Sequence, residues 1–385
     1  MNRINLFEPS YGQREIQAIT EILNSKWTGR GVKTKFLEES FASFLNVEEA
    51  KLTLTTCATE GLFAIFDAIS LNSNDEVIIP TTSFVGVANA ITYYGGKVVF
   101  CDTHPNSLLM NHDDALTKIS SNTRAIVLNH YGGYASCDMK FIENLKDMGI
   151  IVIEDAACAF GARIDSDTSP FLGTLADFGI WSFDSMKLLS MGDGGLIYAK
   201  DESQMDFISK RNYFGLAGDG KTGFANASIN RNEWWEFSVE LPGRRAIIND
   251  LQASIGIVQL ERFDEMCNKR RMLLELYLEI LTSFKELDGL QFQSVSKQSS
   301  PYLVWIQHEE RNELANFLLK NGIYTSFRYL PLHRQRFFNP GLSSLDEFPG
   351  AEWSYTRTLN LPLHSNLSKD NVEFICDSIR NFLRG

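Results

Sequence analysis

Lys187, within the stretch SFDSMKLLSMGDGG (182–195), has clear potential for chemistry. Met186 and Leu188 flank it, and three glycines follow within eight residues. A lysine in apolar company is most often a surface residue whose stem covers apolar neighbours. The alternative is a reactive lysine, whose pKa burial would lower so that the neutral amine becomes a nucleophile. The segment alone fits both interpretations.

A carboxylate follows a second apolar stretch, IIVIEDAACAFGA (150–162). Four apolar residues lead directly into Glu154 and Asp155, so one acidic side chain is expected at the end of a buried strand. A buried carboxylate needs a cationic partner or a bound group. An aspartate at this place can also cap the N-terminus of a helix, and the sequence leaves both roles open for Asp155.

Three further positions follow other predicted strands. Ala58 and Thr59, in LTLTTCATEGLFAI, begin a predicted helix whose free amides could bind a phosphate, although an ordinary helix cap has the same pattern. Phe84 comes shortly after the strand EVIIP, where an aromatic ring could stack on a flat ligand or pack in the core. Ser182 stands near the end of the apolar run FGIWSF.

The elements that must position these residues alternate along the chain. Between about residues 50 and 200, short β-rich runs are separated by helical patterns, which predicts an α/β fold with a mostly parallel sheet between helices. Ligands bind at the carboxyl ends of such strands, so the candidate residues are expected to meet there. A smaller α+β unit follows, and we predict two domains, 1–250 and 251–385.

Composition narrows the possible functions. The net charge of −12 disfavours a protein that binds nucleic acid or an anionic membrane. The six cysteines have no regular spacing, so we expect reduced thiols rather than disulfides or a metal site. The first residues lack the apolar core of a signal peptide, and no apolar run reaches the length of a membrane span. These features predict a soluble cytoplasmic protein.

A phosphate cup, an aromatic plate, a buried carboxylate and an apolar-flanked lysine together suit pyridoxal 5′-phosphate (PLP) held as a Schiff base. The chain resembles the DegT/DnrJ/EryC1/StrS family of sugar aminotransferases over nearly its whole length. The motifs that carry the resemblance are SKWTGRGVKTKFLEESFASFL, DEVIIPTTSFVGVANAI, RAIVLNHYGG, EDAACAFGA, SFDSMKLLSMGDGG, NDLQASIGIVQLERFD and TRTLNLPLH. The resemblance implies the PLP-transferase fold of type I.

The resemblance also assigns roles to individual residues. Lys187 would form the Schiff base, Asp155 would pair with the pyridinium nitrogen, and Phe84 would stack on the ring. The phosphate would be held by Ala58, Thr59 and Ser182.

The match departs from the family pattern at the edges of this site. Cys158 stands where the family often has a glutamine that contacts the ring hydroxyl, and Cys57 replaces the serine of its Ser-Gly-Thr phosphate turn. Family members are dimers with shared active sites, and the segment PGRRAIINDLQ would reach the partner. There, Arg244 or Arg245 would replace an asparagine that contacts the phosphate, and the sequence does not say which.

The resemblance implies an aminotransferase that moves an amino group from L-glutamate to a keto-sugar, expected to be nucleotide-linked, for surface polysaccharides such as lipopolysaccharide or for natural-product sugars. A sugar 3-dehydratase is an alternative, but those relatives carry histidine at the position of Lys187. A non-catalytic PLP-binding regulator and a lyase or desulfurase are others. The first lacks a DNA-binding segment. The second needs a mobile nucleophilic cysteine, whereas Cys158, just after the predicted cofactor aspartate Asp155, is expected to be fixed in place.

Substrate specificity is expected to depend on a few contacts in three segments. They are Trp27–Lys35, the polar stretch 215–245 and Tyr324–His333.

Overall fold

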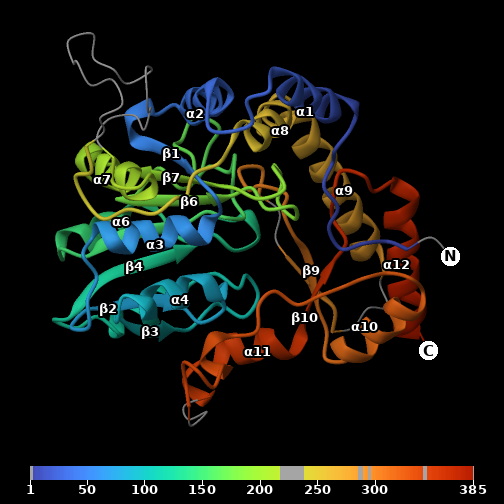
Figure 1. The fold of residues 1–385 in the computed structure, drawn as a ribbon. Coiled ribbons are helices and arrows are strands. Elements are labelled where there is room, and N and C mark those ends of the chain that lie inside the picture. The colour runs from blue at the N-terminus through green and yellow to red at the C-terminus, as the bar shows by residue number, and fades with distance from the viewer. Residues whose placement is uncertain (1–2, 217–237, 285–288, 294–295, 341–344, 385) are drawn as a thin grey trace.

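The structure of this protein is a computed structural model that describes residues 3–216, 238–284, 289–293, 296–340 and 345–384 (Figure 1). The middle of the stretch 215–245, for which a specificity role is expected, lies outside these residues. Two sheets organise the fold, one of seven strands and one of three. Within the described ranges, no helix is long and apolar enough to cross a membrane.

The larger sheet is mostly parallel, as predicted. Its strands, in spatial order, are β1 (Leu52–Thr55), β7 (Gly195–Ala199), β6 (Phe178–Ser182), β5 (Ile151–Asp155), β4 (Thr123–Asn129), β2 (Glu76–Pro80) and β3 (Lys97–Cys101). The pairings among β6, β5, β4, β2 and β3 are all parallel, and β7 is antiparallel to both of its neighbours. The carboxyl ends of β5 and β6 therefore lie side by side, which brings Asp155 and Ser182 to one edge.

Helices cover both faces of this sheet, because its strands are apolar on both sides. Along β4, Ala125 and Val127 belong to one buried cluster, and Ile126 and Leu128 belong to the other. The helices that contribute to the first cluster are α3 (Ala58–Ala68), α4 (Val85–Tyr93) and α7 (Glu202–Asn212). Those that contribute to the second include α2 (Val32–Leu45), α5 (His112–Thr117) and α6 (Met139–Asp147).

A smaller α+β unit lies beside the large sheet, also as predicted (Figure 1). Its antiparallel sheet has the order β10 (Thr358–Leu361), β9 (Val304–Gln307) and β8 (Gln291–Phe292). A third buried cluster joins this sheet to α9 (Phe263–Ser283), α10 (Arg311–Lys320) and α12 (Lys369–Arg384). The remaining helix of this unit is α11 (Pro349–Arg357), and short 3-10 turns occur at Glu49–Lys51, Tyr131–Gly133, Leu332–Arg334 and Leu345–Glu347.

The two units are connected through α8 (Asp250–Glu261), which packs on α1 (Gln13–Ser25) and α2. The predicted boundary after residue 250 therefore falls at the first turn of a helix whose contacts are with the N-terminal unit. The next helix, α9, contributes to the buried cluster of the smaller unit. The position of the boundary stays a prediction.

A buried carboxylate at the start of α8 holds the beginning of α2 in place. Asp250 accepts hydrogen bonds from the backbone amides of Gly31 and Thr34, at 2.9 and 3.0 Å, and from the Thr34 hydroxyl at 2.8 Å. The N-terminus of α2 thus receives its cap from a residue more than two hundred positions away in the sequence. A negative charge is favourable at this end of a helix.

Replacing Asp250 with alanine should lower the free energy of unfolding by about 2 kcal/mol, because the amides of Gly31, Lys33 and Thr34 and the Thr34 hydroxyl lose their acceptor. Asp250→Asn keeps one acceptor oxygen and should lose less. Chemical denaturation of both variants measures the effect, with Glu275→Ala, an exposed residue within α9, as the control. An Asp250→Ala protein as stable as the control would contradict this role.

Candidate active site

The reactive lysine expected from the sequence lies in the loop that follows β6. The loop folds back on itself, since the amide of Met191 donates to the carbonyl of Phe183 at 2.9 Å and Gly192 adopts a positive φ of 82°. The half-buried Lys187 side chain lies inside this loop, with Nζ 3.4 Å from Cys158 Sγ. Its ammonium also lies 5.0 Å from the centre of the Tyr302 ring.

The charge of this lysine is set by competing effects. Burial lowers the pKa of Lys187, but the acidic groups of Cys158, Tyr302, Tyr329 and Asp155 raise it by more. The net pKa lies well above the ordinary value, so Lys187 carries its proton at neutral pH. The interpretation that burial alone would free the amine is therefore wrong in direction, because it ignored the acidic groups that the fold brings to this lysine.

Asp155 is the last residue of β5, and its carboxylate is buried with one hydrogen-bond donor, the amide of Ala157 at 3.1 Å. Burial raises the pKa of Asp155, and the hydrogen bond from Ala157 and the positive charge of Lys187 oppose that rise. No α-helix begins between β5 and β6, so the alternative role of Asp155 as a helix cap finds no helix to serve in this fully described stretch.

The neighbouring acid, Glu154, is held by the protein itself. Its carboxylate accepts hydrogen bonds from the amides of Gly173, Leu175 and Ala176, at 2.7–2.9 Å, and lies 3.0 Å from the ring of His130. Glu154 and Asp155 point to opposite faces of the strand, as successive residues do. Glu154 is therefore a structural carboxylate, and Asp155 retains free acceptor capacity.

The N-terminus of α3 approaches the same edge of the sheet. A Cβ atom on Gly195, at the start of β7, would lie only 2.7 Å from the amide nitrogen of Ala58, so glycine is what allows this close packing. Gly195 pairs directly with Ser182 on β6. The structure thus brings Ala58 and Ser182 together, and Cys57 caps the helix by accepting from the Glu60 amide at 3.5 Å.

A second helix N-terminus, that of α4, lies beside the first. A Cβ atom on Gly86 would lie 3.1 Å from Oγ1 of Thr59, which shows that the first turns of α3 and α4 are neighbours. Phe84 precedes α4 and is 45% exposed, and its ring centre lies 5.6 Å from that of Tyr329. Phe84 is therefore an accessible aromatic face rather than a core residue.

Arg244 and Arg245 lie in different surroundings, and no described contact joins either to Lys187 of the same chain. Arg244 Nη1 lies 3.4 Å from Oε2 of Glu60, and its guanidinium lies over the ring of Phe63. Arg245 is exposed and lines a cleft of about 1590 Å³ together with Trp27. The two side chains face different environments.

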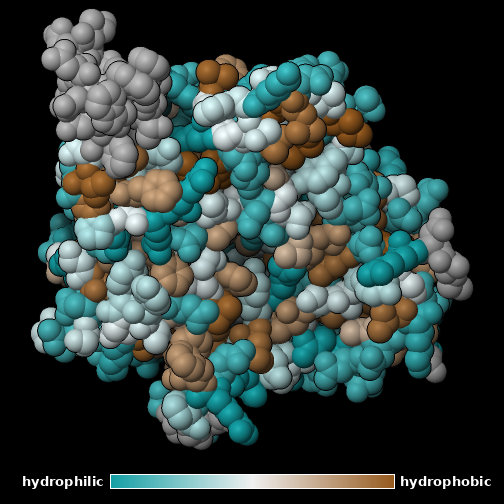
Figure 2. Space-filling model, in the orientation of Figure 1, coloured by the Kyte–Doolittle hydropathy of each residue, from teal (hydrophilic) through white to brown (hydrophobic). Residues whose placement is uncertain are grey.

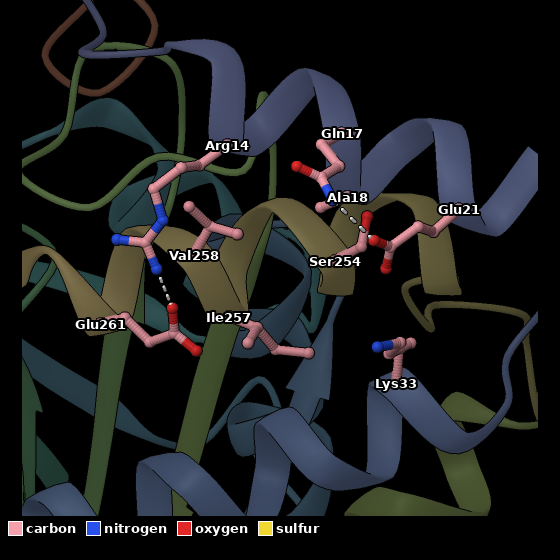
Figure 3. Close-up of a pocket in the computed structure, with 9 residues that line it drawn as sticks. All are labelled: Arg14, Gln17, Ala18, Glu21, Lys33, Ser254, Ile257, Val258 and Glu261. Atoms are coloured by element: carbon pink, nitrogen blue, oxygen red, sulfur yellow. Dashed lines mark hydrogen bonds and ion pairs between the residues drawn. The ribbon is translucent and has the colours of Figure 1, made fainter.

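A smaller groove of about 270 Å³ lies between α1 and α8 (Figure 3). An ion pair between Arg14 and Glu261 crosses it, and Gln17 donates to Glu21 along one wall. Neither this groove nor the larger cleft is lined by Lys187 or Asp155. The candidate active site is therefore identified by its chemistry rather than by the size of a cavity.

Several side chains that the structure places here are not among the predicted site residues. The ring of Tyr302 stacks on that of Phe7, at 5.6 Å and an interplanar angle of 17°. Arg328 and Tyr329 also lie here, within a segment that was expected to govern specificity. No motif or spacing marks these positions, because their relation to Lys187 arises only when the smaller unit and the N-terminal segment pack against the large sheet.

Comparison with known proteins identifies the family. The sequence pattern of the DegT/DnrJ/EryC1/StrS aminotransferase family matches residues 9–380. The chain belongs to this family. The resemblance stated from the sequence is thereby confirmed, and the chain is a PLP-dependent sugar aminotransferase. Solved structures that share its fold include a PLP-form and a PMP-form.

Individual relatives match over almost their full length. A protein of Saccharopolyspora spinosa named dTDP-4-dehydro-2,3,6-trideoxy-D-glucose 4-aminotransferase is 35% identical, covering 98% of this chain and 96% of its own. GDP-perosamine synthase of Escherichia coli O157:H7 is 28% identical, covering 99% of both chains. The crystal structure of the aminotransferase TlmJ from Streptoalloteichus hindustanus has a TM-score of 0.90 at 37% identity, covering 100% of this chain and 99% of TlmJ. The α/β fold of type I is confirmed.

The described residues fit PLP. Two adjacent helix N-termini offer open amides to a phosphate, and Gly195 leaves the space that lets one of them approach the sheet. Asp155 is a buried carboxylate with acceptor capacity to spare, which suits a protonated ring nitrogen. Phe84 presents an accessible face, and Lys187 presents an amine.

Capture of PLP by the cofactor-free protein should accelerate by about tenfold per pH unit between pH 7 and pH 9, because only the neutral amine of Lys187 reacts and its pKa lies above this range. Borohydride trapping followed by peptide mapping measures the rate and should place the label on Lys187. Lys200→Ala, an exposed lysine after β7, is the control. A rate that levels off below pH 8, or a label elsewhere, would overturn the assignment.

Proposed function

We propose that this enzyme transfers the amino group of L-glutamate to the keto group of a nucleotide-linked deoxysugar. The observation that carries the proposal is the position of a half-buried lysine, Lys187, and a buried carboxylate, Asp155, where the neighbouring parallel strands β6 and β5 end. The names of the two curated relatives both specify sugars linked to a nucleoside diphosphate, dTDP in one and GDP in the other.

The proposed roles follow from the position of each group. When bound, PLP supplies an electron sink for the broken Cα–H bond of the amino donor. The amine of Lys187, in its neutral form, would take the proton from Cα and return a proton later, acting as general base and then as general acid. The carboxylate of Asp155 keeps the ring nitrogen protonated by accepting its hydrogen bond.

The remaining predicted residues hold the cofactor in place. The amides of Ala58 and Thr59 and the hydroxyl of Ser182 bind the phosphate, where the positive end of the α3 dipole favours a dianion. Phe84 stacks on the ring. Cys158 takes the place of a carboxamide beside the ring hydroxyl, and its sulfur also contacts Lys187 at 3.4 Å.

We place the enzyme in the cytoplasm, where thiols stay reduced. All six cysteines are described and free in the structure, which supports this location. The amino sugar that it makes would enter surface polysaccharides, such as lipopolysaccharide, or natural products.

A homodimer with shared sites is the proposed assembly. Six large apolar side chains between Tyr11 and Phe36 are exposed, including Trp27 at 62% and Val32 at 80%. Figure 2 shows apolar surface over α1, which belongs to this segment, and over α8. Exposed apolar side chains gathered in this way are typical of an interface.

Arg245 is the arginine that we propose for the partner's phosphate. The guanidinium of Arg244 is held inside its own chain by Glu60 and Phe63, whereas that of Arg245 is exposed in the cleft beside Trp27. An exposed guanidinium at an interface can make a bidentate contact to a phosphate of the neighbouring chain.

Incubation with L-glutamate and a panel of nucleotide-linked keto-sugars should yield 2-oxoglutarate and an amino sugar, both identified by mass spectrometry. Lys187→Ala is the matched control, because it removes the amine and should abolish product. If no sugar in the panel is aminated while 2-oxoglutarate still accumulates with another amine acceptor, the assignment of a nucleotide-linked sugar is wrong.

Mixing inactive Lys187→Ala chains with inactive Arg245→Ala chains should restore about a quarter of wild-type activity. Half of the randomly formed dimers then contain both variants, and each of these has one intact site of two. Arg244→Ala chains are the control, and we expect them to be active without mixing. Failure to recover activity after verified subunit exchange would place Arg245 outside the partner's site.

A further inference from the structure

Arg328 lies at the rim of the candidate site, in the segment between β9 and β10. The centre of its guanidinium is 4.4 Å from the ring centre of Phe7 and 5.9 Å from that of Tyr329. Its Nη2 is 3.0 Å from the sulfur of Met186, the residue immediately before Lys187. The cation is half-buried among aromatic rings and a thioether.

Backbone hydrogen bonds from both units fix this position. The amide of Arg328 donates to Oδ1 of Asn360, in β10, at 2.8 Å. Its carbonyl accepts from the hydroxyl of Tyr131, which follows β4 of the large sheet. Because Asn360 and Tyr131 are buried, the backbone of Arg328 is clamped where the two units meet, and its side chain cannot drift far from the site.

No carboxylate neutralises this arginine within the part of the chain that the structure describes. Arg334, six residues later, binds both Glu352 oxygens, and Arg357 pairs with Glu309 at 3.4 Å. Arg328 has no described ion pair; its side-chain partners are the sulfur of Met186, a weak acceptor at 3.0 Å, and the neutral hydroxyl of Tyr329. A guanidinium has five donors arranged to match a carboxylate, so most of the binding capacity of Arg328 remains open.

The neighbours of Arg328 are also the walls of the reactive site. Tyr329 contacts Phe84, the proposed ring-stacking residue, with 5.6 Å between ring centres. Phe7 stacks on Tyr302, whose ring centre is 5.0 Å from Lys187 Nζ. The open guanidinium is therefore one side chain away from the reacting amine on one side and from the proposed cofactor ring on the other.

An anion bound at this place has two chemical sources in the proposed reaction, a carboxylate of the amino donor and the diphosphate of the sugar nucleotide. An α-amino acid carries its carboxylate on the same carbon as the amine that reacts. In a 4-keto-sugar nucleotide, the diphosphate is attached across the sugar ring from the keto carbon. A cation next to the reactive lysine therefore fits the carboxylate.

We propose that Arg328 binds the α-carboxylate of the amino donor and determines that the donor is an α-amino acid. The inference rests on the proposed function, since it requires an amino acid as donor. Arg328 acts on the first half-reaction, in which the amino group enters the enzyme, and leaves the second half-reaction, with the keto-sugar, unchanged.

The test separates the half-reactions in the holoenzyme. Arg328→Gln should lower kcat/KM for L-glutamate by about 100-fold, because a bidentate charge-assisted contact is lost. The single-turnover rate of the amino form with a keto-sugar should stay within about threefold of wild type. Arg328→Lys keeps the positive charge but loses the bidentate geometry of the guanidinium, so its kcat/KM for L-glutamate should lie between those of wild type and Arg328→Gln. The matched control is Arg357→Gln, an arginine of the same unit outside the site.

The identity of the bound group is tested with two amides of the donor. Isoglutamine lacks the α-carboxylate, so wild type and Arg328→Gln should use it equally poorly. Glutamine keeps the α-carboxylate and should show the same penalty on substitution as glutamate. Calorimetry with glycolate, an unreactive α-hydroxy carboxylate, gives a readout independent of turnover and should show weaker binding to Arg328→Gln at equal PLP content.

The possible outcomes distinguish the role of Arg328 from its alternatives. Selective loss of the glutamate half-reaction, together with equal use of isoglutamine, supports the proposal. Loss of the keto-sugar half-reaction instead would assign Arg328 to the diphosphate and overturn it, as would unchanged kinetics in both halves. If wild type accepts no amino acid at all, the proposed function fails rather than the role of Arg328. An Arg328→Gln protein that does not bind PLP is replaced by Arg328→Lys, for which an unchanged kcat/KM also overturns the proposal.

Discussion

The site depends on a carboxylate that the fold buries without giving it enough partners. Asp155, at the inner end of β5, has one hydrogen-bond donor of its own. Leaving a charged group in this state costs several kcal/mol, which nearby positive charge must offset. Lys187 supplies such a charge, and Asp155 in return contributes to raising the pKa of Lys187. The charge of Lys187 thereby lowers the cost of burying Asp155.

The large sheet is built to maintain this pair. β5 lies between β4 and β6, and both pairings are parallel, so the carboxyl end of β5 cannot move without its neighbours. Glu154 anchors the opposite face of the same strand through three backbone amides and His130. Glu154 thus has its hydrogen-bond partners within the protein, whereas Asp155 retains free acceptor capacity.

The sequence is enough to group the site residues of the large N-terminal unit, but it does not indicate those of the smaller unit. Lys187, Asp155 and Phe84 follow apolar strands, and the rule that ligands gather at carboxyl ends of parallel strands is enough to group them. Tyr302 and Arg328 belong to the second unit, and their approach depends on the docking of one unit onto another, which no local pattern encodes. The direction of the Lys187 pKa does not follow from the local sequence either, because the groups that raise it come from other segments: Cys158 and Asp155 from the first unit, and Tyr302 and Tyr329 from the second.

The cap that Asp250 provides to α2 has a consequence for engineering this enzyme. Asp250 lies five residues after Arg245 and holds the amides of Gly31 and Thr34, so the rim that includes Trp27 is tied to the start of α8. If this rim were replaced by that of a relative to change the accepted sugar, the new segment would still have to donate hydrogen bonds to Asp250. A chimaeric enzyme should therefore take the segment around Gly31 and Thr34 and the start of α8 from the same parent protein.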